Sequence, residues 1–99
     1  MNVYILGVEW KLDFCDTLSD FGECQVDERL IKIRRLELET AREQQIMAET
    51  LIHEILHAIF AMMDIDMKAT DEESTVTRLA MGLASVFADP KNDRILGYL

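Results

Sequence analysis

The sequence contains few of the residues that build metal, redox or nucleic-acid sites. Its 99 residues include two histidines, two cysteines and 10 basic residues against 19 acidic ones. The net charge of −9 argues against nucleic acid as a partner, because phosphate binding needs a basic surface. The charge is compatible with a cationic peptide or a basic protein partner, although acidity of this size also serves solubility alone.

The two cysteines, Cys15 and Cys24, form no C-x-x-C pair, which excludes the usual zinc-ribbon and redox motifs. We expect reduced thiols in a cytoplasmic protein, with a disulfide between them as the alternative. Residues 1–10 lack the basic segment of a signal peptide. No segment approaches the ~18 uninterrupted apolar residues of a membrane span, so no membrane partner is expected.

Length and composition predict a single globular domain over residues 1–99. A chain of this size has room for one modest core, which buries about 60 to 70% of the surface that the unfolded chain exposes. Hydrophobic residues make up 49% and charged residues 29%, the ordinary balance of a soluble domain.

The first third of the chain reads as β-structure. Residues 3–14 alternate between apolar and polar positions, which predicts one long strand with a buried face formed by Tyr4, Leu6, Val8, Trp10, Leu12 and Phe14. Residues 16–20 read as a loop, and the short runs at 21–26 and 30–34 as a hairpin. The prediction is a three-stranded antiparallel sheet. The alternative is a single charged helix over residues 28–45.

Two helices are expected after the sheet, giving an α+β fold. The first begins near residues 40–44 and runs to about Met63, with core contacts at Ile46, Leu51, Ile55 and Ile59. The second covers residues 71–87, with Thr70 as its N-cap and Glu73 as the reciprocal capping partner. Its predicted core face consists of Val76, Leu79, Ala80, Leu83, Val86 and Phe87. Asp89 and Pro90 end this helix, and residues 91–99 have room for one more helical turn.

The stretch TLIHEILHAIF, residues 50–60, carries the chemistry. His53 and His57 are four positions apart, so on a helix both imidazoles lie on one face and can reach one metal ion. Glu54 is placed to act as general base toward the water that zinc activates. Two simpler interpretations are a surface helix that happens to carry these residues and a metal held only for structure.

A catalytic zinc site normally takes three protein ligands, and the chain has no third histidine. A carboxylate must complete the site. Glu72 and Glu73 open the second helix, 15 and 16 residues after His57, whereas Asp64 and Asp66 lie just beyond the first helix. Position 73 shares the inward stripe of Val76 and Ala80, and position 72 shares that face through Val76 and Leu79.

Three stretches in this order, FGECQVDERLIKI, TLIHEILHAIF and EESTVTRLAMGLASVFADP, resemble the small phage-encoded zincin-like metallopeptidases, minimal relatives of the gluzincin and SprT-like proteins. The resemblance covers about residues 1–90. It implies a minimal zincin fold, with zinc bound by His53, His57 and a glutamate at 72 or 73, and Glu54 as general base. It tips the choice toward Glu73, with Glu72 as the alternative. For a phage-encoded chain, the cytoplasm would be that of the host.

The expected function is therefore zinc-dependent hydrolysis of peptide bonds, with an extended peptide or protein substrate added to an exposed sheet edge. The alternative is a non-catalytic zinc-containing binding or regulatory protein that keeps the zincin fold. Larger zincins supply a Tyr, His or Arg to stabilise the oxyanion, and here the candidates by residue type are Tyr4, Arg78, Arg94 and Tyr98.

Overall fold

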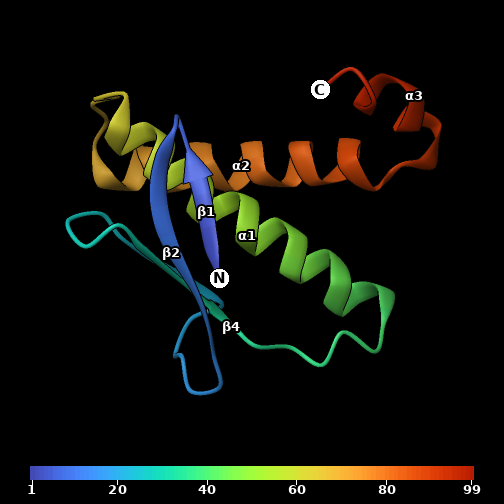
Figure 1. The fold of residues 1–99 in the computed structure, drawn as a ribbon, viewed down its shortest axis with the longest axis horizontal. Helices are drawn as coiled ribbons and strands as arrows, with labels where there is room; N and C mark the ends of the chain where they lie inside the picture. The colour runs from blue at the N-terminus through green and yellow to red at the C-terminus, as the bar shows by residue number, and fades with distance from the viewer.

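The computed structural model describes residues 1–99 and shows an α+β fold with a four-stranded mixed sheet (Figure 1). The strands are β1 (Asn2–Ile5), β2 (Val8–Cys15), β3 (Gly22–Gln25) and β4 (Leu30–Arg34), in the sheet order β1-β2-β4-β3. The helices are α1 (Ala41–Met62), α2 (Ala69–Ala88) and α3 (Asp93–Leu96), with a short 3₁₀ turn, η1, at Pro90–Asn92.

The predicted long strand over residues 3–14 is instead a hairpin of β1 and β2. The chain reverses at Leu6 and Gly7, which have φ of 50° and 77°. Positive φ at both central positions is the requirement of a type I′ turn, and the glycine supplies it without strain. Ile5 then pairs with Val8 across the hairpin. The inward face predicted for residues 3–14 therefore does not hold for the residues before the turn. Tyr4 and Leu6, expected inside, are exposed.

The sheet is mixed rather than three-stranded antiparallel, because β4 pairs parallel with β2 on one side and antiparallel with β3 on the other. β4 is the only strand of the sheet with no exposed residue, and burial of Ile31 and Ile33 favours its central position. β3 carries Gly22 and polar side chains, and it stays at the edge. The hairpin of residues 21–34 is confirmed, and the alternative helix over residues 28–45 is wrong.

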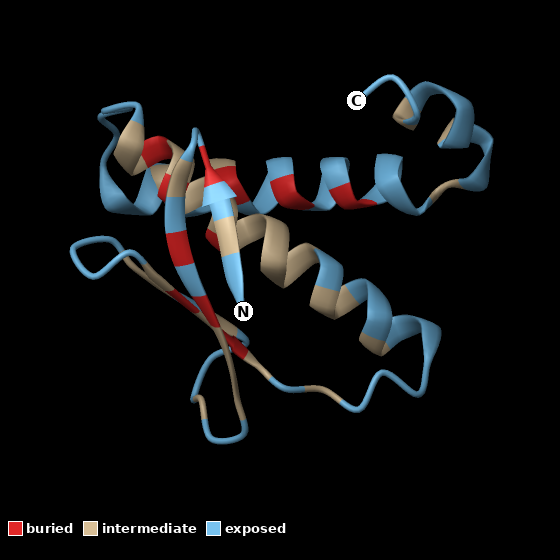
Figure 2. Cartoon of the chain, viewed as in Figure 1, coloured by how far each residue is buried: buried red, intermediate tan, exposed pale blue.

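The core lies between the sheet and α1. Trp10, Leu12, Ile31 and Ile33 are buried with Ala58 of α1 (Figure 2). One face of α1 packs against this cluster through Met47, Leu51, Ile55, Ile59 and Met62. The predicted start of the helix is confirmed, because the side chain of Thr40 accepts a hydrogen bond from the backbone N–H of Glu43.

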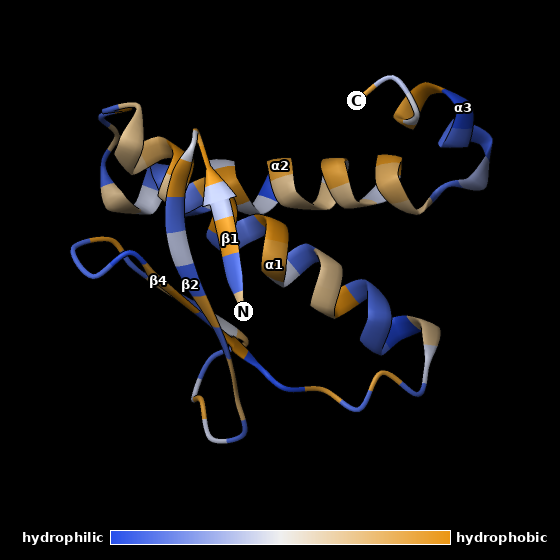
Figure 3. Cartoon of the chain, viewed as in Figure 1, coloured by the Kyte–Doolittle hydropathy of each residue, from blue (hydrophilic) through white to orange (hydrophobic).

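α2 packs mainly against α1, and the two helices lie side by side in Figure 1. Its buried stripe consists of Val76, Ala80 and Ala84, small residues that allow the helices to approach closely. The larger residues expected in the core, Leu79, Leu83, Val86 and Phe87, are exposed and form apolar bands on the helix (Figure 3).

The ends of α2 agree only in part with the sequence prediction. The helix begins at Ala69 after Lys68, so Thr70 lies inside it and the predicted cap is wrong. The predicted end at Asp89 and Pro90 is confirmed, and the tail forms η1 and α3. Both cysteines are free thiols. Neither long helix has the unbroken apolar length needed to cross a membrane.

Candidate metal centre

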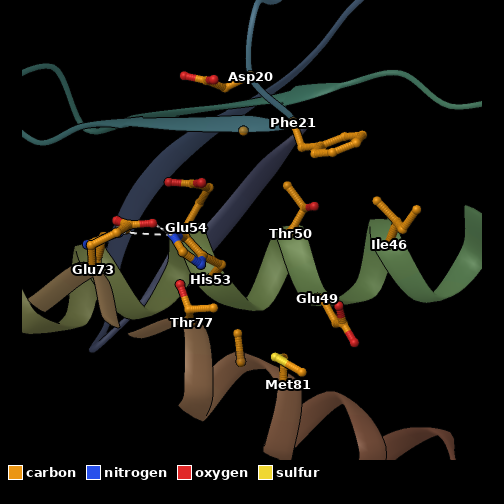
Figure 4. Close-up of a pocket in the computed structure, with 13 residues that line it drawn as sticks. Asp20, Phe21, Ile46, Glu49, Thr50, His53, Glu54, Glu73, Thr77 and Met81 are labelled. Atoms are coloured by element: carbon orange, nitrogen blue, oxygen red, sulfur yellow. Dashed lines mark hydrogen bonds and ion pairs between the residues drawn. The ribbon is translucent and has the colours of Figure 1, made fainter. Parts of the chain in front are cut away.

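Three side chains on two helices converge where α1 meets the start of α2. The Nε2 atoms of His53 and His57 are 3.2 Å apart. The carboxylate of Glu73 lies against both, with Oε1 2.9 Å from His53 Nε2 and Oε2 2.9 Å from His57 Nε2. The three contacts join the two Nε2 atoms to each other and each of them to a different oxygen of the Glu73 carboxylate. Figure 4 shows Glu73 beside His53 at one end of a cleft.

These separations fit the ligands of a tetrahedral zinc ion. Ligand atoms about 2.0 to 2.1 Å from zinc and at tetrahedral angles lie roughly 3.3 Å from one another. The observed separations of 2.9 to 3.2 Å are within a few tenths of an ångström of that value. A small opening between α1 and α2 would lengthen the two contacts to Glu73 toward this value, whereas the 3.2 Å between the histidine nitrogens, both on α1, is already close to it.

The hydrogen bonding of His57 also fits a cation at the centre. Its Nδ1 lies 2.7 Å from Glu72 Oε2, which assigns the Nδ1 proton to that contact. In a neutral imidazole the Nε2 atom then presents a lone pair toward Glu73, itself an acceptor when ionised. Two facing acceptors need a positive centre between them, either shared protons or a metal ion. The donor set of two imidazoles and a carboxylate is typical of zinc.

Glu72 and Glu73 therefore occupy different places around His57. Glu73 faces the Nε2 atoms of both histidines, whereas Glu72 contacts only the opposite nitrogen of one ring. A carboxylate on the far nitrogen of a ligating histidine holds the ring orientation and increases its basicity. Asp64 and Asp66 are exposed beyond the end of α1 and do not line the cleft.

Glu54 is the one buried charged residue and lies between α1 and the edge strand β3. It forms a group with His53 and His57 in which the potential ligand atoms lie within 4.8 Å of one another. A Cβ placed on Gly22 would come within 2.8 Å of Glu54 Oε2 and of Thr50 Cγ2. Only glycine in β3 leaves room for this carboxyl group, so strand and helix together fix its position.

Burial dominates the electrostatics of the centre. It raises the pKa of Glu54 to about 7 from the usual 4.5, an effect that His57 opposes and Glu73 reinforces. Burial also lowers the pKa of His53, with Glu73 acting in the opposite direction. Both shifts favour the neutral forms of groups that the protein withdraws from water.

Cys24 of β3 lies on the other side of Glu54. Burial, followed by the negative charges of Glu54 and Glu72, raises the pKa of this thiol to about 12. The residue lines a second cavity of about 400 Å³ together with His57 and Glu72. The thiol therefore stays protonated at neutral pH.

The larger cleft, of about 630 Å³, runs from the centre along α1. None of the oxyanion candidates Tyr4, Arg78, Arg94 and Tyr98 lines it. Sequence reasoning identified His53, Glu54, His57 and Glu73 among the lining residues. It missed others, which include Asp20, Phe21, Thr50, Thr77 and Met81. Thr50 was detectable because it precedes Glu54 by four positions on α1. Asp20 and Phe21 carry no local signal, because only the folding of the β2–β3 loop brings them to the cleft.

The comparisons with known proteins give no family. The chain matches no protein-family model, no curated protein and no solved structure. The residues and geometry of the centre itself are therefore the evidence for function.

Proposed function

We propose that this protein is a zinc-dependent peptidase of minimal zincin architecture, with His53, His57 and Glu73 as the metal ligands. The observation that carries the proposal is the convergence of the two Nε2 atoms and the Glu73 carboxylate, with contacts of 2.9 to 3.2 Å. The His-Glu-x-x-His motif and its resemblance to the zincin-like metallopeptidases point to the same chemistry.

Three protein ligands leave one position of a tetrahedral ion for water or substrate. Zinc held there would polarise a peptide carbonyl and lower the pKa of a water molecule. Glu54 accepts the proton from that water and delivers it to the leaving amine. Its burial between Gly22 and α1 keeps the carboxyl group on the side of the centre that faces β3.

The substrate in this proposal is an extended peptide bound along β3. This strand is the last in the sheet, so its outer edge is free to pair with an added strand. The two cavities beside the centre share Glu54 and His57, and one includes Gly22 whereas the other includes Cys24. Both cavities thus border the same strand, which supports a peptide passing across the centre along β3.

One observation favours the alternative of a non-catalytic zinc-containing binding protein. No tyrosine, arginine or third histidine lines the cleft, so the chain offers no side chain of the type that stabilises an oxyanion in larger zincins. Catalysis by this protein would depend on the metal and on backbone N–H groups for that role. Activity measurements separate the two functions.

The test compares purified wild type with Glu54→Gln after expression in zinc-supplemented medium. We expect stoichiometric zinc in both proteins by elemental analysis, and hydrolysis of unstructured peptides by wild type alone. The amide keeps the shape of the side chain but cannot accept the proton. His57→Ala should lose the zinc, whereas the neighbouring Asp71→Asn should retain it.

Each failure has a separate meaning. Wild-type protein that takes up no zinc contradicts the metal centre. Zinc binding without hydrolysis favours the binding protein, and equal hydrolysis by Glu54→Gln would assign the activity to another residue or to a contaminant.

A further inference from the structure

The larger cleft changes character along its length. Beside the metal centre its lining is polar, with Thr77 next to His53 and Thr50 between Glu54 and Ile46 (Figure 4). Farther along α1 it meets its apolar lining, which consists of Phe21, Ile46, Ala80 and Met81. Figure 4 shows Phe21 and Ile46 on the side of Thr50 away from Glu73. A side chain that extends along the cleft from the centre therefore reaches an apolar surface.

The wall that carries Phe21 is held in place by Arg34 of β4. The guanidinium carbon lies 4.8 Å from the centroid of the Phe21 ring, in cation–π geometry. Arg34 Nε donates a hydrogen bond to Leu18 O at 3.0 Å, and its backbone N–H donates to Phe21 O at 2.7 Å. The wall is therefore built before any ligand binds. The arginine itself does not line the cleft.

Apart from the two histidines of the centre, all ionisable side chains in the lining of this cleft are acidic. The four acidic residues are Asp20, Glu49, Glu54 and Glu73, and no lysine or arginine is present. Asp20 and Glu49 border the cleft on opposite sides in Figure 4. Neither takes part in an ion pair, and Glu49 accepts a hydrogen bond only from the amide of Gln45. Neither carboxylate is therefore held by a lysine or arginine of the protein itself.

We propose that this cleft selects peptides that carry a bulky apolar residue beside a lysine or arginine. The apolar side chain packs against Phe21, Ile46 and Met81 in the cleft, where removal of its surface from water favours binding. The cationic side chain lies at the border, between Asp20 and Glu49, in a field that repels acidic peptides. This inference rests on the proposed function, because it concerns the substrate of the same centre.

The test uses four synthetic peptides of equal length that differ only at two adjacent positions. These positions hold Leu-Lys, Leu-Glu, Gly-Lys or Gly-Glu. Binding to zinc-loaded Glu54→Gln is measured by fluorescence anisotropy, and hydrolysis is measured with wild type. We expect the Leu-Lys peptide to bind about tenfold more tightly than the Leu-Glu or Gly-Lys peptide. Equal binding of all four, or no binding of any, overturns the inference.

Variants assign the preference to the two parts of the cleft. Asp20→Asn combined with Glu49→Gln should remove the discrimination between Lys and Glu and keep that between Leu and Gly. Ile46→Thr should remove the discrimination between Leu and Gly and keep that between Lys and Glu. Glu28→Gln combined with Asp66→Asn removes two exposed carboxylates outside both cavities and should change neither preference. An equal effect of this control pair would mean that net charge, not the cleft, sets the preference.

The two proposals fail in distinguishable ways. Selective binding by Glu54→Gln without hydrolysis by wild type contradicts the peptidase and keeps the substrate class as the ligand of a binding protein. Hydrolysis of all four peptides at equal rates, with equal binding, keeps the peptidase and overturns the substrate class.

Discussion

His57 contacts two consecutive glutamates through its two different ring nitrogens. Nε2 lies 2.9 Å from Glu73, and Nδ1 lies 2.7 Å from Glu72. Neighbouring residues on a helix point about 100° apart, so both can reach one ring only where the helix start lies directly across from it. The first turn of α2 therefore surrounds the histidine, with one carboxylate toward the centre and the other behind the ring.

This arrangement predicts unequal effects of removing the two glutamates. Glu73→Ala removes a proposed ligand and should weaken zinc binding more than 100-fold, whereas loss of a supporting carboxylate such as Glu72 typically costs about 10- to 100-fold. Competition with a chromophoric chelator measures both affinities, and Asp71→Asn serves as the control. A larger loss in Glu72→Ala than in Glu73→Ala would reverse the two roles.

Gly22→Ala should destabilise the protein, because the added Cβ meets Glu54 and Thr50 at 2.8 Å. Overpacking of this kind costs about 1 to 3 kcal/mol. Gly82→Ala is the matched control on α2, where a Cβ meets nothing within 4 Å. That change should stabilise the helix by about 0.5 to 1 kcal/mol. Urea unfolding measures the free energy of unfolding of both variants. Similar values for the two would contradict the tight contact of β3 with α1.

The raised pKa of Glu54 predicts a pH dependence of the stability of the metal-free protein. Between the usual pKa of 4.5 and the folded value of about 7, the folded protein keeps a proton that the unfolded chain releases. Stability therefore falls as pH rises through this window, by at most about 3 kcal/mol. Urea unfolding at pH 5 and pH 8, in the presence of EDTA, should show a larger decrease for wild type than for Glu54→Gln. Parallel decreases would mean that Glu54 titrates normally.

Cys24 should react slowly with iodoacetamide in the folded protein at pH 8. With a pKa of about 12, only about one thiol in 10⁴ is ionised at this pH, and the thiolate is the reactive form. The same residue in urea provides the control, because unfolding removes the burial and the neighbouring carboxylates. Mass spectrometry of the labelled peptide should show a rate about 10³-fold lower in the folded state. Comparable rates would place the thiol in water.

The start and end of α1 and the hairpin of residues 21–34 were predictable because the signals are local. Thr40 caps the helix through the backbone of Glu43, three residues later, and a turn of four residues, 26–29, separates the two strands. The hairpin at Leu6 and Gly7 was missed because the apolar alternation continues through it. Gly7 was the available signal, since a glycine within a strand pattern marks a turn or bulge.

The interior face of α2 was predictable only in part from hydrophobicity. Val76 and Ala80 are buried as predicted. The larger residues Leu79 and Leu83 are exposed, and the smaller Ala80 and Ala84 are buried. Close packing of two helices selects small side chains at the contact, so the size of a residue and not its hydrophobicity decided its burial here.

The sequence by itself determined the spacing of His53, Glu54 and His57, because four positions on a helix place two side chains on one face whatever the rest of the chain does. The tertiary structure decided the order of the strands, the close contact of Gly22 with Glu54, and the opposite placement of Glu72 and Glu73 around one histidine. These features join residues far apart in the chain. Their geometry depends on how the sheet and the two helices pack together, which no local pattern encodes.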